Sequence, residues 1–231
     1  MNGTLALVGS GEYLPPMEPV DRFLLGQIRG EARVVCLPTA AGKEGAERIG
    51  HWSNLGVEHF TRLGAQVEPV GIINRATAED PGLVARIRAA NFVYLSGGDP
   101  DYLFKTLNGT PTFAAIEGVL QGGGVVAGCS AGAIIFGEIY PGFPTLLPWR
   151  PAFNYLPGAV ILPHYDEFGD SAFAKLARAA MPRRLTILGV EGNTALVCSD
   201  GKCEVRGSGG VTVCNSKRKV RLTEGEPVEW P

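Results

Sequence analysis

Long hydrophobic runs, low-complexity segments and a strong charge of either sign are all missing from this sequence. Its apolar stretches are each too short to span a membrane. The first begins at Thr4 without a basic leader, which predicts a first strand and not a signal peptide. A formal net charge of −2 provides no basic surface for nucleic acid or for an anionic membrane. We therefore expect no nucleic-acid partner and no membrane partner.

Cysteine and histidine are scarce, and neither is arranged as a metal site. The five cysteines are odd in number and have no C-x-x-C spacing; they are Cys36, Cys129, Cys198, Cys203 and Cys214. This pattern favours reduced thiols and a cytoplasmic location over a disulfide framework or a zinc site. Gly9-Ser10-Gly11 lacks the third glycine of a dinucleotide-binding loop. We expect the protein to use neither a metal nor another cofactor.

The composition is typical of a globular protein, and strand patterns alternate with helix patterns along the chain. Of its 231 residues, 45% are hydrophobic and 19% are charged, and no repeat or linker divides it, so we predict one domain over residues 1–231. Strand patterns occur at Leu5–Val8, Arg33–Leu37, Val67–Ile72, Phe92–Leu95, Val125–Ala127, Ala159–Leu162 and Thr186–Val190. Helical spacing of apolar residues occurs between them, at Val20–Gln27, Glu44–Leu63, Pro81–Ala90, Pro111–Leu120 and Ser171–Ala180.

This alternation is typical of an α/β fold with three layers, in which helices cover both faces of a mostly parallel central sheet. After Glu191, shorter runs broken by Asp200-Gly201 and by a Gly-Ser-Gly-Gly segment predict C-terminal antiparallel hairpins that close one edge. Ligands of such sheets bind beyond the carboxyl ends of the strands. Polar residues that directly follow strands are therefore the candidates for a functional site.

The segment Gly128–Ala133 has the pattern of a nucleophile elbow. A strand-like run precedes it and an apolar, helix-like run follows it. Glycines two residues before and two residues after Ser130 allow the sharp turn that exposes a hydroxyl at the end of a sheet. The N-terminus of the following helix offers free N–H groups close to that hydroxyl. We predict that Ser130 is a nucleophile.

Cys129 is the rival of Ser130, because a thiol is the better intrinsic nucleophile at neutral pH. The spacing favours the serine, since the residues two before and two after Cys129 are Ala127 and Ala131. The residue beside the apex of an elbow normally packs inward. We expect Cys129 to act as a small buried hydrophobic side chain.

A serine nucleophile needs a base and an acid that orients the base. His164 directly follows a predicted strand, whereas His51 and His59 fall within one helical segment, so we predict His164 as the base. Glu191 follows another strand, and Asp166 lies two residues past the histidine. We favour Glu191, because an acid on a separate strand holds the imidazole ring better than a loop neighbour.

Backbone N–H groups near Ser130 can stabilise a developing oxyanion, each contributing about 3 kcal/mol to the lowering of the barrier. We predict that the N–H of Ala131 and an N–H of the Gly97-Gly98 turn, that of Gly98, form this oxyanion hole. The residues that we expect to bind the substrate on the neighbouring loops are Glu12, Gly97, Asp99 and Asp166.

Four motifs together resemble those of a known family. They are Gly128-x-Ser130-Ala131-Gly132-Ala133, Ser96-Gly97-Gly98-Asp99, His164, and Glu191-Gly192-Asn193-Thr194-Ala195-Leu196. In this order, over roughly residues 1–215, they resemble the dipeptidase E/cyanophycinase family of serine peptidases, whose fold is similar to class I glutamine amidotransferases. The resemblance implies a triad of Ser130, His164 and Glu191 and no metal. It also implies a small peptide substrate, cleaved at a peptide or isopeptide bond next to an aspartyl residue.

One segment and one single position depart from the pattern of that family. Arginines often follow the histidine there, whereas the segment Tyr165–Asp170 is acidic here, and Pro100 replaces a glutamine that commonly follows the Gly-Gly-Asp motif. Carboxylates in the cleft would repel an aspartyl side chain and attract a positive group. We therefore expect a preference for a cationic or free-amino group, unless Arg75 or Arg150 anchors a substrate carboxylate.

Two other functions remain open from the sequence. A glutamine-amidotransferase-like domain would need a cysteine at the apex of the elbow, where this chain has Ser130. A small-molecule-binding relic without activity would not need Ser130, His164 and Glu191 together. The sequence leaves open whether the enzyme is a dipeptidase or an isopeptidase, and it leaves open the oligomeric state, a homodimer included.

Overall fold

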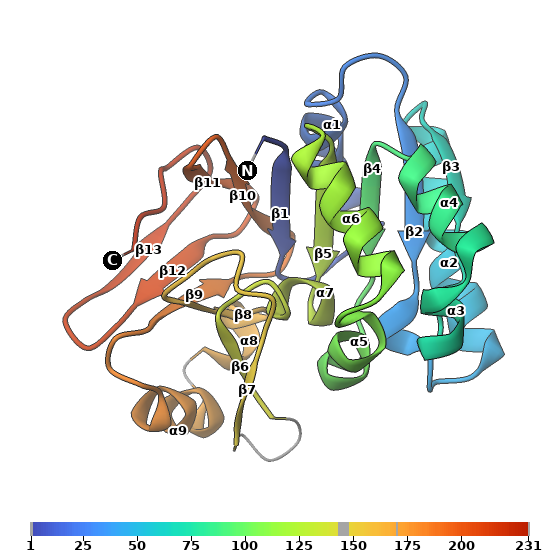
Figure 1. Cartoon of the computed structure of the whole chain (residues 1–231). Coiled ribbons are helices and arrows are strands. Elements are labelled where there is room, and N and C mark those ends of the chain that lie inside the picture. Colours follow the sequence, from blue (N-terminus) through green and yellow to red (C-terminus); the bar gives the residue numbers. More distant parts are fainter. Residues whose placement is uncertain (1, 143–147, 170, 231) are drawn as a thin grey trace.

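A seven-stranded sheet lies at the centre of the protein (Figure 1). The computed structural model describes residues 2–142, 148–169 and 171–230. The strands of this sheet are β1 (Thr4–Val8), β2 (Arg33–Leu37), β3 (Gln66–Pro69), β4 (Phe92–Leu95), β5 (Val125–Cys129), β10 (Thr194–Ser199) and β11 (Lys202–Gly207). Their order is β11-β10-β1-β5-β4-β2-β3. The five N-terminal strands are parallel, and β10 and β11 are antiparallel to their neighbours.

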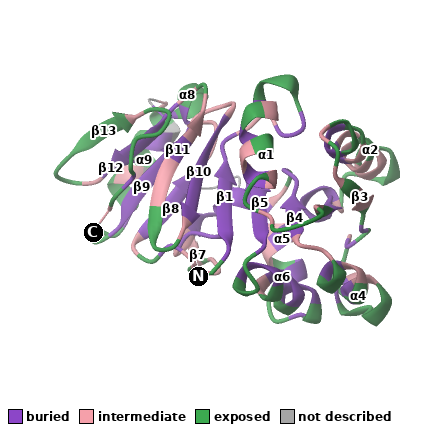
Figure 2. Ribbon diagram, turned by 90° about the horizontal axis from the view of Figure 1, so that it is seen from above, coloured by how far each residue is buried: buried purple, intermediate pink, exposed green. Residues whose placement is uncertain are grey.

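Helices cover both faces of this sheet, which confirms the three layers that the sequence predicts. They are α1 (Glu18–Leu25), α2 (Ala46–Arg62), α3 (Arg75–Glu79), α4 (Pro81–Ala89), α5 (Pro100–Leu107) and α6 (Pro111–Gln121). Leu5 and Leu7 belong to a core that includes residues of α4 and α6, and Ala6 and Val8 to one that includes residues of α1 and α2. Figure 2 shows β1, β4 and β5 buried between helices whose outer surfaces are exposed. In the described part of the chain, every helix is too short or too polar to cross a membrane.

A second sheet of four strands lies beside the first and corrects the predicted topology. Its strands are β8 (Ala159–Leu162), β9 (Thr186–Val190), β12 (Val211–Cys214) and β13 (Lys219–Leu222), in the order β13-β12-β9-β8. The sequence predicts β8 and β9 in the central sheet and both C-terminal hairpins at one edge. Instead, the antiparallel strand β10 occupies the edge of β1 in the first sheet. The strands β8 and β9 pair with each other in the second sheet, and β9 also pairs with β12.

Helix α7 (Ala131–Ile134) and a hairpin of β6 (Ile139–Pro141) and β7 (Trp149–Pro151) connect β5 of the first sheet to β8 of the second. The other short elements are the helices α8 (Tyr165–Phe168) and α9 (Ala172–Ala180), between β8 and β9, and two 3-10 turns at Pro15–Met17 and Thr39–Ala41. Because α7 contacts both β5 and β8, the carboxyl ends of these two strands meet (Figure 1). The sequence does not predict α3, α5 or α8, since helices this short show little periodicity.

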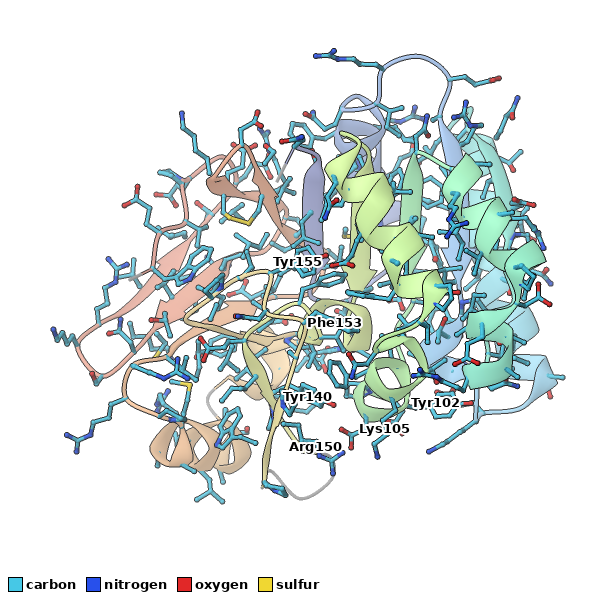
Figure 3. The ribbon with its side chains drawn as sticks, in the orientation of Figure 1. Tyr102, Lys105, Tyr140, Arg150, Phe153 and Tyr155 are labelled. Atoms are coloured by element: carbon cyan, nitrogen blue, oxygen red, sulfur yellow. A yellow bond between two sulfur atoms is a disulfide. The ribbon has the colours of Figure 1, made fainter. Side chains whose placement is uncertain are left out.

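The cysteines include one bonded pair, which corrects the expectation of unpaired thiols. Cys198 of β10 and Cys203 of β11 lie opposite each other in the register and form a disulfide, drawn as a yellow bond in Figure 3. The tight turn between the two strands brings their Cα atoms to 4.1 Å, so no C-x-x-C spacing is needed. The other three cysteines are free and buried.

Candidate active site

Ser130 occupies a sharp turn between β5 and α7. Its backbone has φ 51° and ψ −110°, a conformation that non-glycine residues rarely adopt. The turn is closely packed: a methyl group at Gly128 would lie 2.2 Å from the carbonyl oxygen of Gly132, and one at Gly132 would lie 2.5 Å from that of Leu95. The structure therefore has the strand–turn–helix geometry of the predicted elbow, and it needs both glycines.

His164 approaches Ser130 from the second sheet. It follows β8 and precedes α8, in a left-handed backbone conformation with φ 51°. Its Nε2 lies 3.1 Å from Ser130 Oγ, within hydrogen-bond distance. The other two histidines are elsewhere: His51 is exposed on α2, and buried His59 bonds Asp21 on α1. The structure thus brings together the predicted nucleophile and the predicted base.

Glu191 lies at the end of β9 with its carboxylate bonded to Arg221 of β13. Both of its oxygens accept hydrogen bonds from the guanidinium at 2.6 Å, and this contact raises the pKa of Arg221 above its ordinary value. The strands β8 and β9 are parallel neighbours, with Leu162 opposite Gly189, and His164 and Glu191 each follow the end of one of them. The Glu191 carboxylate itself is held by Arg221. Glu191 as the acid stays a prediction.

A different carboxylate lies nearest to the second ring nitrogen of His164. Glu167 Oε1 is 3.6 Å from Nδ1, and the Glu167 side chain is 56% exposed. Asp166, the rival acid of the sequence analysis, accepts a hydrogen bond from Gly192 N at 2.9 Å. That bond ties α8 to the segment after β9. Glu167 is not among the acids predicted from the sequence, although it lies only three residues after the histidine.

Cys129 is buried beneath the elbow and cannot be the nucleophile in this state. Its side chain is fully covered and donates a hydrogen bond to Glu12 Oε2 at 2.8 Å. Burial, and after it the charge of Glu12, raises the pKa of the Cys129 thiol well above its ordinary value. The thiol therefore stays protonated and unreactive near neutral pH.

Glu12 faces inward, and its predicted contact with a substrate stays a prediction. Only 7% of the residue is exposed, and its Oε1 accepts the N–H of Gly97 at 3.0 Å. The neighbouring Tyr13 hydroxyl lies 3.1 Å from Ser96 Oγ. These contacts hold the Ser96–Gly98 segment beside the nucleophile, since a methyl group at Gly97 would lie 3.3 Å from Ser130 Cβ. The Gly97 N–H, bonded to Glu12, is not free for a substrate.

Gly98 and Ala131, the residues predicted to form the oxyanion hole, both lie close to Ser130 in the structure. Gly98 lines the same cavity as Ser130 and has φ +142°, and a methyl group there would lie 2.5 Å from the Ala40 carbonyl carbon. Only glycine fits this position. Ala131 is the first residue of α7, so its N–H has no acceptor four residues earlier in the helix. Their role as donors stays a prediction.

A cavity of about 810 Å³ opens beside Ser130 and His164. The described residues that line it are Gly98, Asp99, Pro100, Ser130, Ile134, Pro141, Leu162, Pro163, His164, Tyr165, Phe168, Gly169, Ser171 and Ala174. Asp99 is among them, but its Oδ1 accepts the N–H groups of Asp101 and Tyr102 and so caps α5. Its predicted contact with a substrate stays a prediction.

The charged residues expected in the cleft have other neighbours. Neither Asp166 nor Glu167 lines the cavity, and Asp170 lies outside the described residues. Arg75 donates hydrogen bonds to Glu79 and to the carbonyl of Asn108. Arg150, labelled in Figure 3, lies next to α5 and pairs with Asp101 of that helix. The described residues include no cluster of three or more side chains suited to hold a metal ion.

Replacing Glu12 with alanine should lower kcat by about 10-fold or more, because the Gly97 N–H loses its acceptor and Gly98 can shift. In Glu12→Gln the amide oxygen can still accept that bond, so this control should keep most of the activity. Steady-state kinetics and thermal unfolding of both variants check this. A normal kcat in Glu12→Ala, with only a lower melting temperature, would show that Glu12 serves stability alone.

Comparisons with known proteins show the family to which this chain belongs. Residues 5–206 match peptidase family S51. A cyanophycinase from Nostoc sp. strain PCC 7120 is 28% identical over 94% of this chain and 75% of its own length. One from Synechococcus elongatus is 29% identical over 68% of this chain and 52% of its own length. A crystal structure of a peptidase from an acI-B1 Actinobacterium has a TM-score of 0.91 and 33% identity, and the match covers 100% of this chain and 98% of that one. This chain therefore belongs to peptidase family S51, the dipeptidase E/cyanophycinase family of serine peptidases.

Proposed function

We propose that this chain hydrolyses an amide bond of a small peptide through an acyl-enzyme on Ser130. The observation that carries the proposal is the 3.1 Å contact between Ser130 Oγ and His164 Nε2, on the wall of a cavity of about 810 Å³. The strained backbone of Ser130 supports it, because such strain collects at functional sites. Cys129 is buried, so no observation favours the cysteine-dependent amidotransferase.

In the proposed reaction, His164 Nε2 takes the proton of Ser130 as the Oγ atom attacks the substrate carbonyl carbon. The N–H groups of Gly98 and Ala131 stabilise the oxyanion of the tetrahedral intermediate. When the C–N bond breaks, His164 returns the proton to the leaving amine, and an ester on Ser130 remains. Water, deprotonated by His164, then hydrolyses the ester and regenerates the hydroxyl.

The proposal assigns the acid to Glu191. A carboxylate near His164 stabilises the imidazolium that forms when Ser130 loses its proton. The parallel pairing of β8 and β9, which precede His164 and Glu191, supports this assignment, and the Asp166–Gly192 bond keeps the two following segments together. The ion pair with Arg221 opposes it. Glu167, which is exposed, is the second candidate.

A fluorophosphonate probe tests the nucleophile without knowledge of the substrate. The probe should add one adduct to the native protein, and peptide mapping should place it on Ser130. A His164→Gln variant, which lacks the base, should label far more slowly. The urea-unfolded protein should not label, because its serine is not activated. Failure of the native protein to label, or an adduct on a residue other than Ser130, would contradict the proposed function.

A further inference from the structure

The wall of the cavity beside Ser130 is formed largely by apolar side chains. They come from α7, β6, β8, α8 and α9, and they are Ile134, Pro141, Leu162, Phe168 and Ala174. Phe168 is 53% exposed, which is unusual for a large apolar residue. Its ring centroid lies 6.1 Å from that of His164. An apolar side chain beside the base is covered only when something fills the cavity.

Among the described residues of the same wall, charged side chains are scarce. The described residues that line the cavity include no lysine or arginine, and the one acid, Asp99, caps α5. The two arginines that could have anchored a carboxylate, Arg75 and Arg150, are paired elsewhere. A carboxylate that entered this cavity would lose water without gaining an opposite charge from the described residues, which is unfavourable. A cation would meet only Asp99, whose Oδ1 already accepts two N–H groups of α5.

We infer that the cavity receives an apolar side chain, of the size of leucine or phenylalanine, from a substrate residue next to the scissile bond. The inference rests on the proposed peptidase function. Ser130 and His164 line the cavity, so a peptide attacked by Ser130 must place a residue that flanks the bond inside it. A volume of about 810 Å³ accommodates an aromatic side chain together with adjoining backbone. The occupant is thus neutral, neither aspartyl nor cationic.

Two dipeptide series test this inference. In Ala-X and X-Ala, X is alanine, leucine, phenylalanine, aspartate or lysine, and kcat/KM is measured for each. In one of the two series, kcat/KM with leucine or phenylalanine as X should exceed that with alanine by about 10-fold or more. It should also exceed that with aspartate or lysine. The series in which this occurs identifies the side of the scissile bond whose side chain enters the cavity. A best substrate with aspartate or lysine as X in both series would overturn the inference.

Phe168→Ala and Leu176→Ala form a matched pair of variants. Both residues are exposed, Leu176 at 60%, but only Phe168 lines the cavity. Phe168→Ala should reduce the preference for leucine and phenylalanine over alanine, and Leu176→Ala should leave it unchanged. An equal effect of both variants, or no effect of Phe168→Ala, would overturn the inference. Fluorophosphonate labelling separates the two proposals: a protein that labels on Ser130 but lacks the apolar preference contradicts only the inference about the cavity.

Discussion

Replacing Ser130 with alanine should lower kcat by about 10⁴-fold or more, with no loss of folding, because the nucleophile is removed and the turn itself is unchanged. Alanine lacks only the hydroxyl, and the hydrogen bond from the backbone N–H of residue 130 to the Val8 carbonyl, at 3.0 Å, is kept. Hydrolysis of the best dipeptide, compared with the circular dichroism spectrum and melting temperature of each protein, measures both effects.

Cys129→Ala is the matched control at the next position. The thiol is buried and bonded to Glu12, so its loss should cost about 1 kcal/mol of stability through a small cavity and little activity. If Cys129→Ala were inactive while Ser130→Ala still turned over, the thiol would be the nucleophile, and it would have to become exposed and ionised during the reaction.

The site could be predicted from the sequence where its geometry is local. The elbow is specified by Gly128, Ser130 and Gly132, and the structure shows that both glycines are needed for close packing. His164 could be predicted because parallel strands present their carboxyl ends at one edge. That rule assumes that both strands belong to one sheet. In the structure, β8 belongs to the second sheet, yet His164 at its end still lies beside Ser130.

Other features depend on contacts between distant residues and could not be predicted. Whether Glu12 faces the substrate or the interior is decided by Gly97 and Cys129, which lie far from it in the chain. Similarly, the pattern of β9 alone does not indicate whether it pairs with β1 or with β12, because a buried strand has the same composition in either sheet. The apolar wall of the cavity is likewise assembled from five separate elements.

The acidic segment after His164 shows that composition alone does not determine which charges face the cavity. Asp166 and Glu167 are close to the base in sequence, and a cationic substrate was therefore expected. On the short helix α8, however, Asp166 bonds Gly192 and Glu167 is exposed, whereas Phe168 lines the cavity. The direction of each side chain, and not the net charge of the segment, determines what a substrate contacts.

Replacing Glu191 with glutamine should lower kcat by about 10²- to 10⁴-fold, because a neutral amide does not stabilise the imidazolium and can select the wrong tautomer. Since Glu191 also pairs with Arg221, the variant alone does not separate catalysis from structure. Arg221→Gln breaks the same ion pair and keeps the carboxylate, so it should retain most of the activity. The comparison is made by kcat at saturating substrate, with the melting temperature of each variant as the measure of structural damage.

Glu167→Gln completes the comparison of acids. Its carboxylate is solvated, and an exposed contact with His164 contributes little, so we expect only about a two-fold loss. Equal, small losses in Glu191→Gln and Arg221→Gln would mean that Glu191 only ties β9 to β13. A large loss confined to Glu167→Gln would move the acid to α8, one turn after the base. A ranking with Glu191→Gln far below the other two is the result that the triad of Ser130, His164 and Glu191 requires.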